Sequence, residues 1–154
     1  MALYGARTSG TITLSASATK SLWLMNPATD FFVIAQFGIS FKATAASDTV
    51  AVELYRTTTL GSPAGTTATL TKIGRVGDAA SPTTTGLTAL TTEPTAVEVL
   101  ADWEIQPFGG VLDLQYPLSR EPIAAAAGQR LGLRCTTPAG VTPGARSYIW
   151  LDER

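Results

Sequence analysis

Three carboxylates alternate with apolar residues in AVEVLADWEIQ, residues 96–106: Glu98, Asp102 and Glu104. A pair of carboxylates is the chemistry that glycoside hydrolysis requires. As a β-strand, however, the segment places these acids on one face and Val97, Val99, Trp103 and Ile105 on the other. That pattern is typical of the solvated side of an amphipathic strand, so we interpret the three acids as surface residues rather than a glycosidase pair.

The chain contains no histidine. It therefore lacks the commonest general base and transition-metal ligand, and neither a Ser/His/Asp nor a Cys/His arrangement can be built. Cys135 is the only cysteine and alternates with Leu131 and Leu133 in LGLRC, which indicates a buried strand thiol rather than a nucleophile. We predict a protein that is not an enzyme, with no catalytic residues, no cofactor and no metal.

Hydrophobic residues recur with a period of two along most of the chain. The longest such face consists of Phe31, Val33, Ala35, Phe37, Ile39 and Phe41. The apolar segments are separated by turn sequences such as NPATD, QPFGG and TPAGVTPG, and only PIAAAAG suggests even one helical turn. We expect a single all-β domain spanning 1–154, an antiparallel β-sandwich of jelly-roll type with about eight strands.

A Thr/Gly/Pro/Ala-rich connection near 57–94 joins the strand candidates TVAVELYR and AVEVLADWEIQ. A connection of this length is normally functional or partly folded, and ATLTKIGRV could supply a short edge strand within it. Its small side chains lose little rotamer entropy when they dock, so we expect it to contact a neighbouring protein and to add few large side chains to the core. A mobile loop is the alternative. The candidate interface residues are Leu60, Pro63, Thr66, Thr67 and Pro82.

Charged residues make up only 15% of the chain, the net charge is −1, and the mean hydropathy is +0.18. So neutral a surface favours association, and we expect a homo-oligomer, with a trimer favoured. The basic residues form no cluster for nucleic acid. No apolar stretch approaches the roughly 20 residues of a membrane span, and the start lacks the apolar segment of a secretory signal, so we expect a protein made in the cytoplasm without membrane contact.

Five segments resemble small structural proteins of tailed bacteriophages, and with SLWLMNP and FGISFKA the resemblance covers nearly the whole chain. They are ELYRTTTLGSPAGTT (53–67), LTTEPTA (90–96), YPLSREP (116–122), AGQRLGLR (127–134) and YIWLDE (148–153). The resemblance implies a virion component, and we expect it in the phage head, assembled in the host cytoplasm. It further implies a capsid decoration or cement protein that binds the major capsid protein and stabilises the head. It supplies no catalytic residues, and its motifs do not separate head from tail.

The alternative function is a tail or receptor-binding module that binds carbohydrate through exposed aromatic rings. Four aromatic residues could serve as platforms: Trp23, Trp103, Trp150 and Tyr116. The alternation of side chains along residues 96–106 places Trp103 on the apolar face, so we expect it in the core. For Trp23 and Trp150 the sequence leaves both core and surface positions open.

Overall fold

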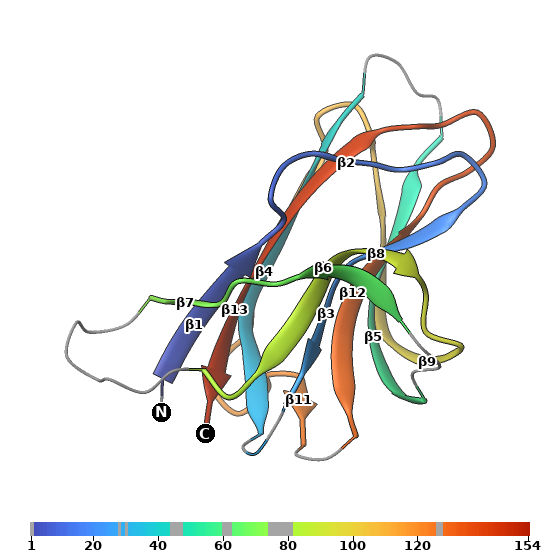
Figure 1. The fold of residues 1–154 in the computed structure, drawn as a ribbon. Coiled ribbons are helices and arrows are strands. Elements are labelled where there is room, and N and C mark those ends of the chain that lie inside the picture. Colours follow the sequence, from blue (N-terminus) through green and yellow to red (C-terminus); the bar gives the residue numbers. More distant parts are fainter. Residues whose placement is uncertain are drawn as a thin grey trace.

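The computed structural model describes residues 2–27, 29, 31–43, 48–59, 63–73, 82–125 and 128–154. Two antiparallel sheets face each other and form a β-sandwich (Figure 1). The seven-stranded sheet has the order β10 (Val111–Gln115), β4 (Phe32–Lys42), β13 (Gly144–Glu153), β1 (Ala2–Arg7) and β7 (Thr71–Lys72), with β11 (Ile123–Ala124) paired to β4 and β2 (Ile12–Thr13) paired to β13.

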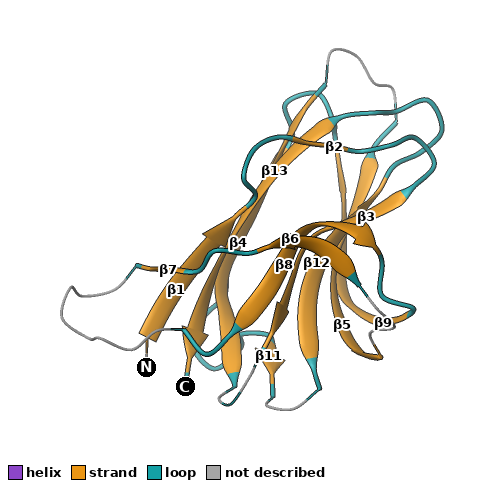
Figure 2. Ribbon diagram, in the orientation of Figure 1, coloured by secondary structure: helices purple, strands orange, loops and turns teal. Residues whose placement is uncertain are grey.

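The second sheet has six strands in the order β6 (Ala64–Thr67), β8 (Thr85–Thr92), β3 (Thr19–Asn26), β12 (Arg130–Thr136), β5 (Val50–Thr59) and β9 (Ala96–Ile105). The described residues contain thirteen strands and no helix, as Figure 2 shows. The predicted all-β sandwich is therefore confirmed. In PIAAAAG, the segment that suggested a helical turn, Ile123 and Ala124 pair with β4 as a short strand, and residues 126 and 127 lie outside the described residues.

Eight of the strands follow jelly-roll topology. Counting from the two termini towards the middle of the sequence, β1 pairs with β13, β3 with β12, β4 with β10, and β5 with β9. This nested pairing is that of one long hairpin rolled into two layers, β10-β4-β13-β1 and β3-β12-β5-β9. The strands beyond the predicted eight are the two-residue strands β2, β7 and β11, together with β6 and β8.

Strands β6, β7 and β8 form an insertion between β5 and β9, within the predicted small-residue connection. β8 and β6 extend one sheet beside β3, and β7 extends the other beside β1, so the chain from 68 to 73 crosses between the sheets (Figure 1). Ala68 N donates to Gly86 O over 2.8 Å, and Ile73 N donates to Leu3 O over 2.9 Å. The expected edge strand within 68–76 is thus β7.

We expected this connection to add few large side chains to the core, and Leu70 and Leu90 are the leucines that pack most closely there. Leu70 packs against the main core, and Leu90 is only 1% exposed. The composition of the connection does not indicate that these leucines are packed, because threonine and alanine predominate around them. The insertion is therefore part of the folded sandwich and covers its open side.

Phe37 lies at the centre of the main core. Its ring centroid is 6.2 Å from that of Trp23, 5.7 Å from that of Trp103 and 6.3 Å from that of Tyr116. Trp23 and Trp103 belong to the six-stranded sheet, whereas Phe37 belongs to the seven-stranded one. Aromatic side chains bury large areas and gain from tilted contacts, so this cluster ties the two layers together.

Two β-bulges alter the predicted faces. In β4, Ala35 has no partner in β13, so Phe32 and Ile34 join the core on one side of it and Phe37 on the other. In β9, Leu100 is the unpaired residue between Val99 and Ala101. Leu100 consequently packs against the core, while Val99 is 42% exposed instead of buried. An extra residue in a strand shifts the alternation of its side chains.

A second, smaller apolar cluster covers the outer face of the six-stranded sheet. It consists of Leu24, Tyr55 and Leu90, with Val97 packed against it. Ser21 N donates to Glu93 Oε1 over 2.7 Å, and the Ser21 and Tyr55 hydroxyls are 2.8 Å apart. These contacts fasten the segment between β8 and β9 to the face of the sheet.

Ala89 in β8 has a φ of 50°, in the left-handed region. A Cβ atom is strained there and glycine is not, so Ala89→Gly should raise the free energy of unfolding by about 1 kcal/mol. Ala51→Gly in β5 is the matched control and should lower it by roughly 0.5–1 kcal/mol. Urea denaturation of both variants measures these changes. Equal destabilisation by both would contradict a strained Ala89.

Candidate functional site

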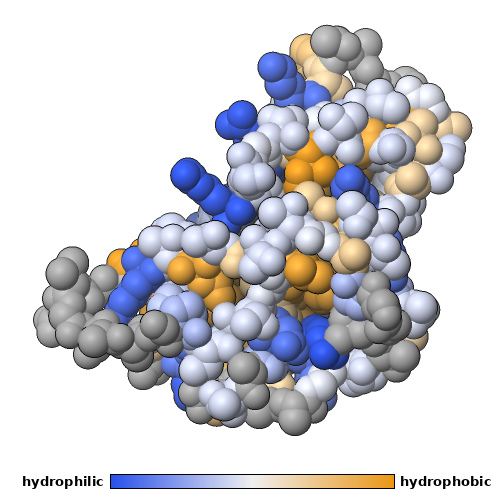
Figure 3. All heavy atoms as spheres, viewed as in Figure 1, coloured by the Kyte–Doolittle hydropathy of each residue, from blue (hydrophilic) through white to orange (hydrophobic). Residues whose placement is uncertain are grey.

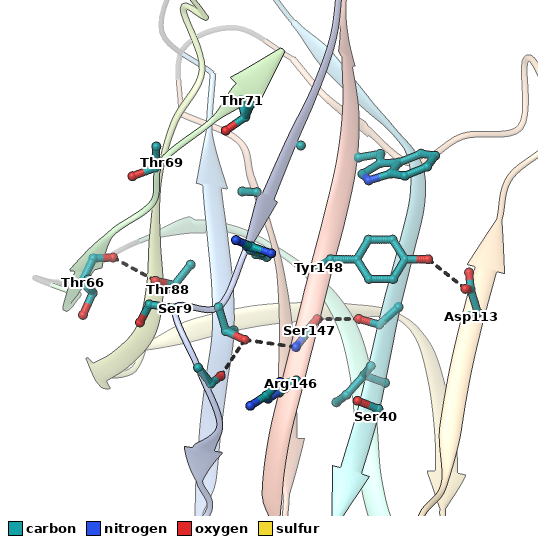
Figure 4. Close-up of a pocket in the computed structure, with 18 of the residues that line it drawn as sticks. Ser9, Ser40, Thr66, Thr69, Thr71, Thr88, Asp113, Arg146, Ser147 and Tyr148 are labelled. Carbon is teal, nitrogen blue, oxygen red and sulfur yellow. Dashed lines mark hydrogen bonds between the residues drawn. The ribbon is translucent and has the colours of Figure 1, made fainter. Parts of the chain in front are cut away.

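A groove of about 1050 Å³ lies on the outer face of the seven-stranded sheet. Its floor is formed by β1, β4, β10 and β13, and its walls include the loop after β1 and residues from the β6–β7 segment. Figure 4 shows Thr66, Thr69 and Thr71 on one side of this groove and Asp113 on the other. The groove thus lies where the insertion meets the jelly roll.

The strand register arranges the floor in two rows. In the first row, Asp113, Gly38, Tyr148 and Arg7 are successive cross-strand neighbours on β10, β4, β13 and β1. In the second row the corresponding residues are Gln115, Gln36, Trp150 and Gly5. The rows are about 7 Å apart, since alternate residues of a strand share a face.

Each aromatic residue of the floor has a glycine as a neighbour on the next strand. A Cβ atom added to Gly38 would lie 2.3 Å from Tyr148 Cε1, and one added to Gly5 would lie 2.4 Å from Ile73 Cδ1 and 3.2 Å from Trp150 Cδ1. The Tyr148 ring therefore occupies space that a side chain at position 38 would need, and it lies across β4 towards Asp113 (Figure 4), whereas the space over Gly5 is filled mainly by Ile73. The ring centroids of Tyr148 and Trp150 are 6.0 Å apart with an interplanar angle of 52°.

Three side chains form a closed hydrogen-bonded group beside these rings. Tyr148 Oη donates to Asp113 Oδ2 over 2.8 Å. Gln36 Nε2 lies 2.8 Å from both Asp113 Oδ1 and Tyr148 Oη, to which it donates. Burial raises the pKa of Tyr148, and the carboxylate of Asp113 raises it further, against the opposing effect of the Gln36 hydrogen bond. Tyr148 is therefore a neutral donor at physiological pH and fixes the orientation of Asp113.

The remaining lining is neutral and rich in hydroxyl groups, apart from two arginines. Thr66, Thr67, Thr69 and Thr71 are exposed along one wall. Arg146 lines the floor beside Ser40, and its Nε donates to Thr11 Oγ1 over 2.9 Å. Arg7 and Arg146 are the cations of this lining and Asp113 is its anion.

Of the predicted interface residues, the structure brings Thr66 and Thr67 together in β6, where both line the groove. Pro63 and Pro82 are partly buried and line no part of it. Pro82 precedes Thr83 and Thr84, whose backbone amides donate to the carboxylate of Glu153. Leu60 lies outside the described residues. The four described residues therefore do not all line the groove.

The three carboxylates of β9 lie on an exposed strand away from the groove. Glu98 forms an ion pair with Arg56 at 3.6 Å, and Glu104 accepts a hydrogen bond from Thr49 Oγ1. Asp102 is exposed and lies opposite Glu53. Cys135 is buried in β12 as predicted, and burial raises the pKa of its thiol.

The four aromatic residues proposed as sugar platforms differ in how deeply they are buried. Trp23 is buried and its Nε1 donates to Ser147 Oγ over 3.0 Å, while Trp103 and Tyr116 pack against the main core. Trp150 is 36% exposed. Its neighbour in the groove, Tyr148, was missed by the sequence analysis, although YIWL places Tyr148 and Trp150 on the face opposite Ile149 and Leu151.

Asp113, Gln36, Gly5 and Gly38 were also missed, because only the strand register brings them together. Among the described residues, no group of three or more His, Cys, Asp and Glu is arranged to hold a metal ion. The described residues include no helix of the length and hydropathy needed to cross a membrane. Comparisons of the sequence with known protein families and with curated proteins found no match.

Replacing Asp113 tests the hydrogen-bonded group directly. Asp113→Asn removes the negative charge and the carboxylate acceptor, so the pKa of Tyr148 should fall towards the ordinary tyrosine value of about 10. Asp102→Asn, which changes an exposed acid of the other sheet, should leave it unchanged. Carbon-13 NMR titration of the tyrosine Cζ resonances measures both. A Tyr148 pKa that is equal in the wild type and Asp113→Asn would contradict the described contact.

Proposed function

We propose that this chain is a non-enzymatic structural component of a phage virion. It acts as a capsid decoration protein that binds the lattice of major capsid protein, as a trimer, and stabilises the head. The role without chemistry is supported by the lack of histidine in the sequence, since histidine is the commonest general base. The phage assignment is supported by the sequence motifs, and the docking role by one structural observation.

That observation is the apolar edge formed by β10, β11 and their adjoining turns. Eight large hydrophobic side chains are exposed among the described residues, and four belong to this edge: Phe108, Val111, Leu118 and Ile123. Leu118 is 82% exposed and Phe108 67%. A row of this kind on a sheet edge marks a surface that a partner protein covers.

The position of the edge fits the resemblance to phage proteins. The motif YPLSREP, residues 116–122, contains Leu118 and connects β10 to β11. Phe108 lies in the turn before β10, so the exposed residues Phe108 and Leu118 flank the strand at its two ends. The motif and the apolar edge therefore coincide.

The rest of the visible surface is weakly polar. Figure 3 shows mostly pale residues with scattered hydrophobic ones and few strongly hydrophilic ones on the face in view. Such a surface loses little charge solvation when it is covered. A contact of about 1,000 Å² or more at each site, repeated over a lattice, would stabilise the head by mass action alone.

A capsid-binding assay tests the function and the edge together. Wild-type protein should saturate heads assembled without it and raise the temperature at which they release DNA. Phe108→Ser combined with Leu118→Asp should reduce occupancy at least about tenfold, since burying an unpaired charge costs well over 1.4 kcal/mol. Val99→Asp, which changes an exposed hydrophobic residue of the other sheet, is the matched control and should bind normally.

A third protein carries Thr66→Asp and Thr67→Asp in β6, at two of the interface residues predicted from the sequence. Loss of binding by this protein alone would move the contact to β6 and contradict the assignment to β10 and β11. Failure of the wild-type protein to bind heads at all would contradict the decoration function.

A further inference from the structure

We propose that the groove on the outer face of the seven-stranded sheet binds an oligosaccharide, with Tyr148 and Trp150 as the platform. The platform lies on β13, whereas Phe108 and Leu118 lie in the turns that flank β10, so replacing Trp150 leaves these two docking residues intact. Val111 of the docking edge also lines the groove. Sugar binding would give the protein a second partner, such as a glycan chain on a cell surface. The proposal rests on the shape of the floor, its polar groups and the pairing of its strands.

The two rings form an apolar surface suited to sugar rings. A pyranose has one face of C–H bonds, which packs on an aromatic face, and a periphery of hydroxyl groups that need hydrogen bonds. The Tyr148 and Trp150 centroids are 6.0 Å apart, a separation comparable to that of neighbouring sugar units in a chain. The absence of a side chain at Gly38 gives the Tyr148 ring room to lie across β4.

The polar groups beside the platform match a polyhydroxylated ligand. Asp113 is exposed, and its carboxylate is held by Tyr148 and Gln36, so its orientation is fixed before a ligand arrives. A carboxylate accepts strong, charge-assisted hydrogen bonds from hydroxyl groups. Arg7 flanks Tyr148 on the side opposite Asp113, and Arg146 lies two residues before it on the same strand. These cations can donate to hydroxyl or carboxylate groups of sugars.

The facing wall adds hydroxyl groups at little entropic cost. Thr66, Thr69 and Thr71 lie opposite Asp113 across the groove (Figure 4). The hydroxyl of Thr88, behind them, donates to Thr66 O over 3.3 Å and links the wall to β8. Threonine side chains have few rotamers, so this wall presents donors and acceptors that are largely ordered in advance.

Two other ligand classes fit less well. An extended peptide binds most readily by pairing with an open strand, but β13, which carries the platform, is paired with β4 and β1 along both of its sides. Nucleic acid requires several cations along its phosphates, whereas the lining offers Arg7 and Arg146 together with the anion Asp113. Recognition by side chains around an aromatic platform favours a saccharide.

Binding is tested with fluorescently labelled protein on an array of neutral and uronic-acid-containing oligosaccharides, followed by isothermal titration with the glycans that bind. Trp150→Ala should weaken binding about tenfold or more through loss of the stacking surface. Asp113→Asn should weaken it by a similar factor through loss of charge-assisted hydrogen bonds. Phe108→Ala, an exposed aromatic residue outside the groove, is the matched control and should bind like the wild type.

The wild-type protein supplies a measurement that does not depend on a variant. Trp23 is buried and Trp103 partly buried, so saturating sugar should change the fluorescence that comes from Trp150. Trp150→Ala should still bind phage heads, which separates this proposal from the capsid function. No saturable binding on the array would overturn the proposal, as would glycan binding that survives both groove variants. Peptide binding in this groove that Trp150→Ala abolishes would overturn it in favour of a peptide site.

Discussion

The contact between Phe37 and the aromatic rings of the opposite sheet is the interaction on which the rest of the structure depends. Phe37 is fully buried and lies 5.7 Å from Trp103 and 6.2 Å from Trp23, centroid to centroid. Loss of a buried phenylalanine ring typically costs about 3–5 kcal/mol, a large part of a domain's stability. Because side chains alternate along β4, a buried Phe37 forces Gly38 outward, where it makes room for Tyr148. The core thereby positions the floor of the groove.

The insertion of β6, β7 and β8 covers two strand edges that the jelly roll alone would leave unpaired. The strands β1 and β3 end their layers on the same side, and without additions their backbone groups would form open edges. β7 pairs with β1, β8 pairs with β3, and the crossing between them carries Leu70 onto the core. The same crossing supplies the threonine wall of the groove. The opposite edge, at β10 and β11, keeps its exposed hydrophobic residues and is the proposed docking surface.

The fold class could be predicted from sequence because period-two alternation marks strands and frequent turn residues mark their ends. The faces of β4 and β9 could not be predicted throughout, since the bulges at Ala35 and Leu100 each add one residue with no sequence signal. The candidate site was harder to predict than the strand faces. Asp113, Gly38, Tyr148 and Arg7 come from four strands, and only the tertiary register makes them neighbours. Of the predicted interface residues, Thr66 and Thr67 line the groove. They do so because of the position of β6 in the fold, which composition alone does not predict.

The register between β4 and β13 is the central claim, because a slip by one residue would send Tyr148 and Trp150 into the core. Nuclear Overhauser effects in solution test it most directly. Gly38 pairs with Tyr148, and the Tyr148 ring occupies the position of a Gly38 side chain. We predict strong cross-peaks between the Gly38 Hα protons and the ring protons of Tyr148. Cross-peaks from Gly38 to the side chain of Ile149, with none to Tyr148, would contradict the account.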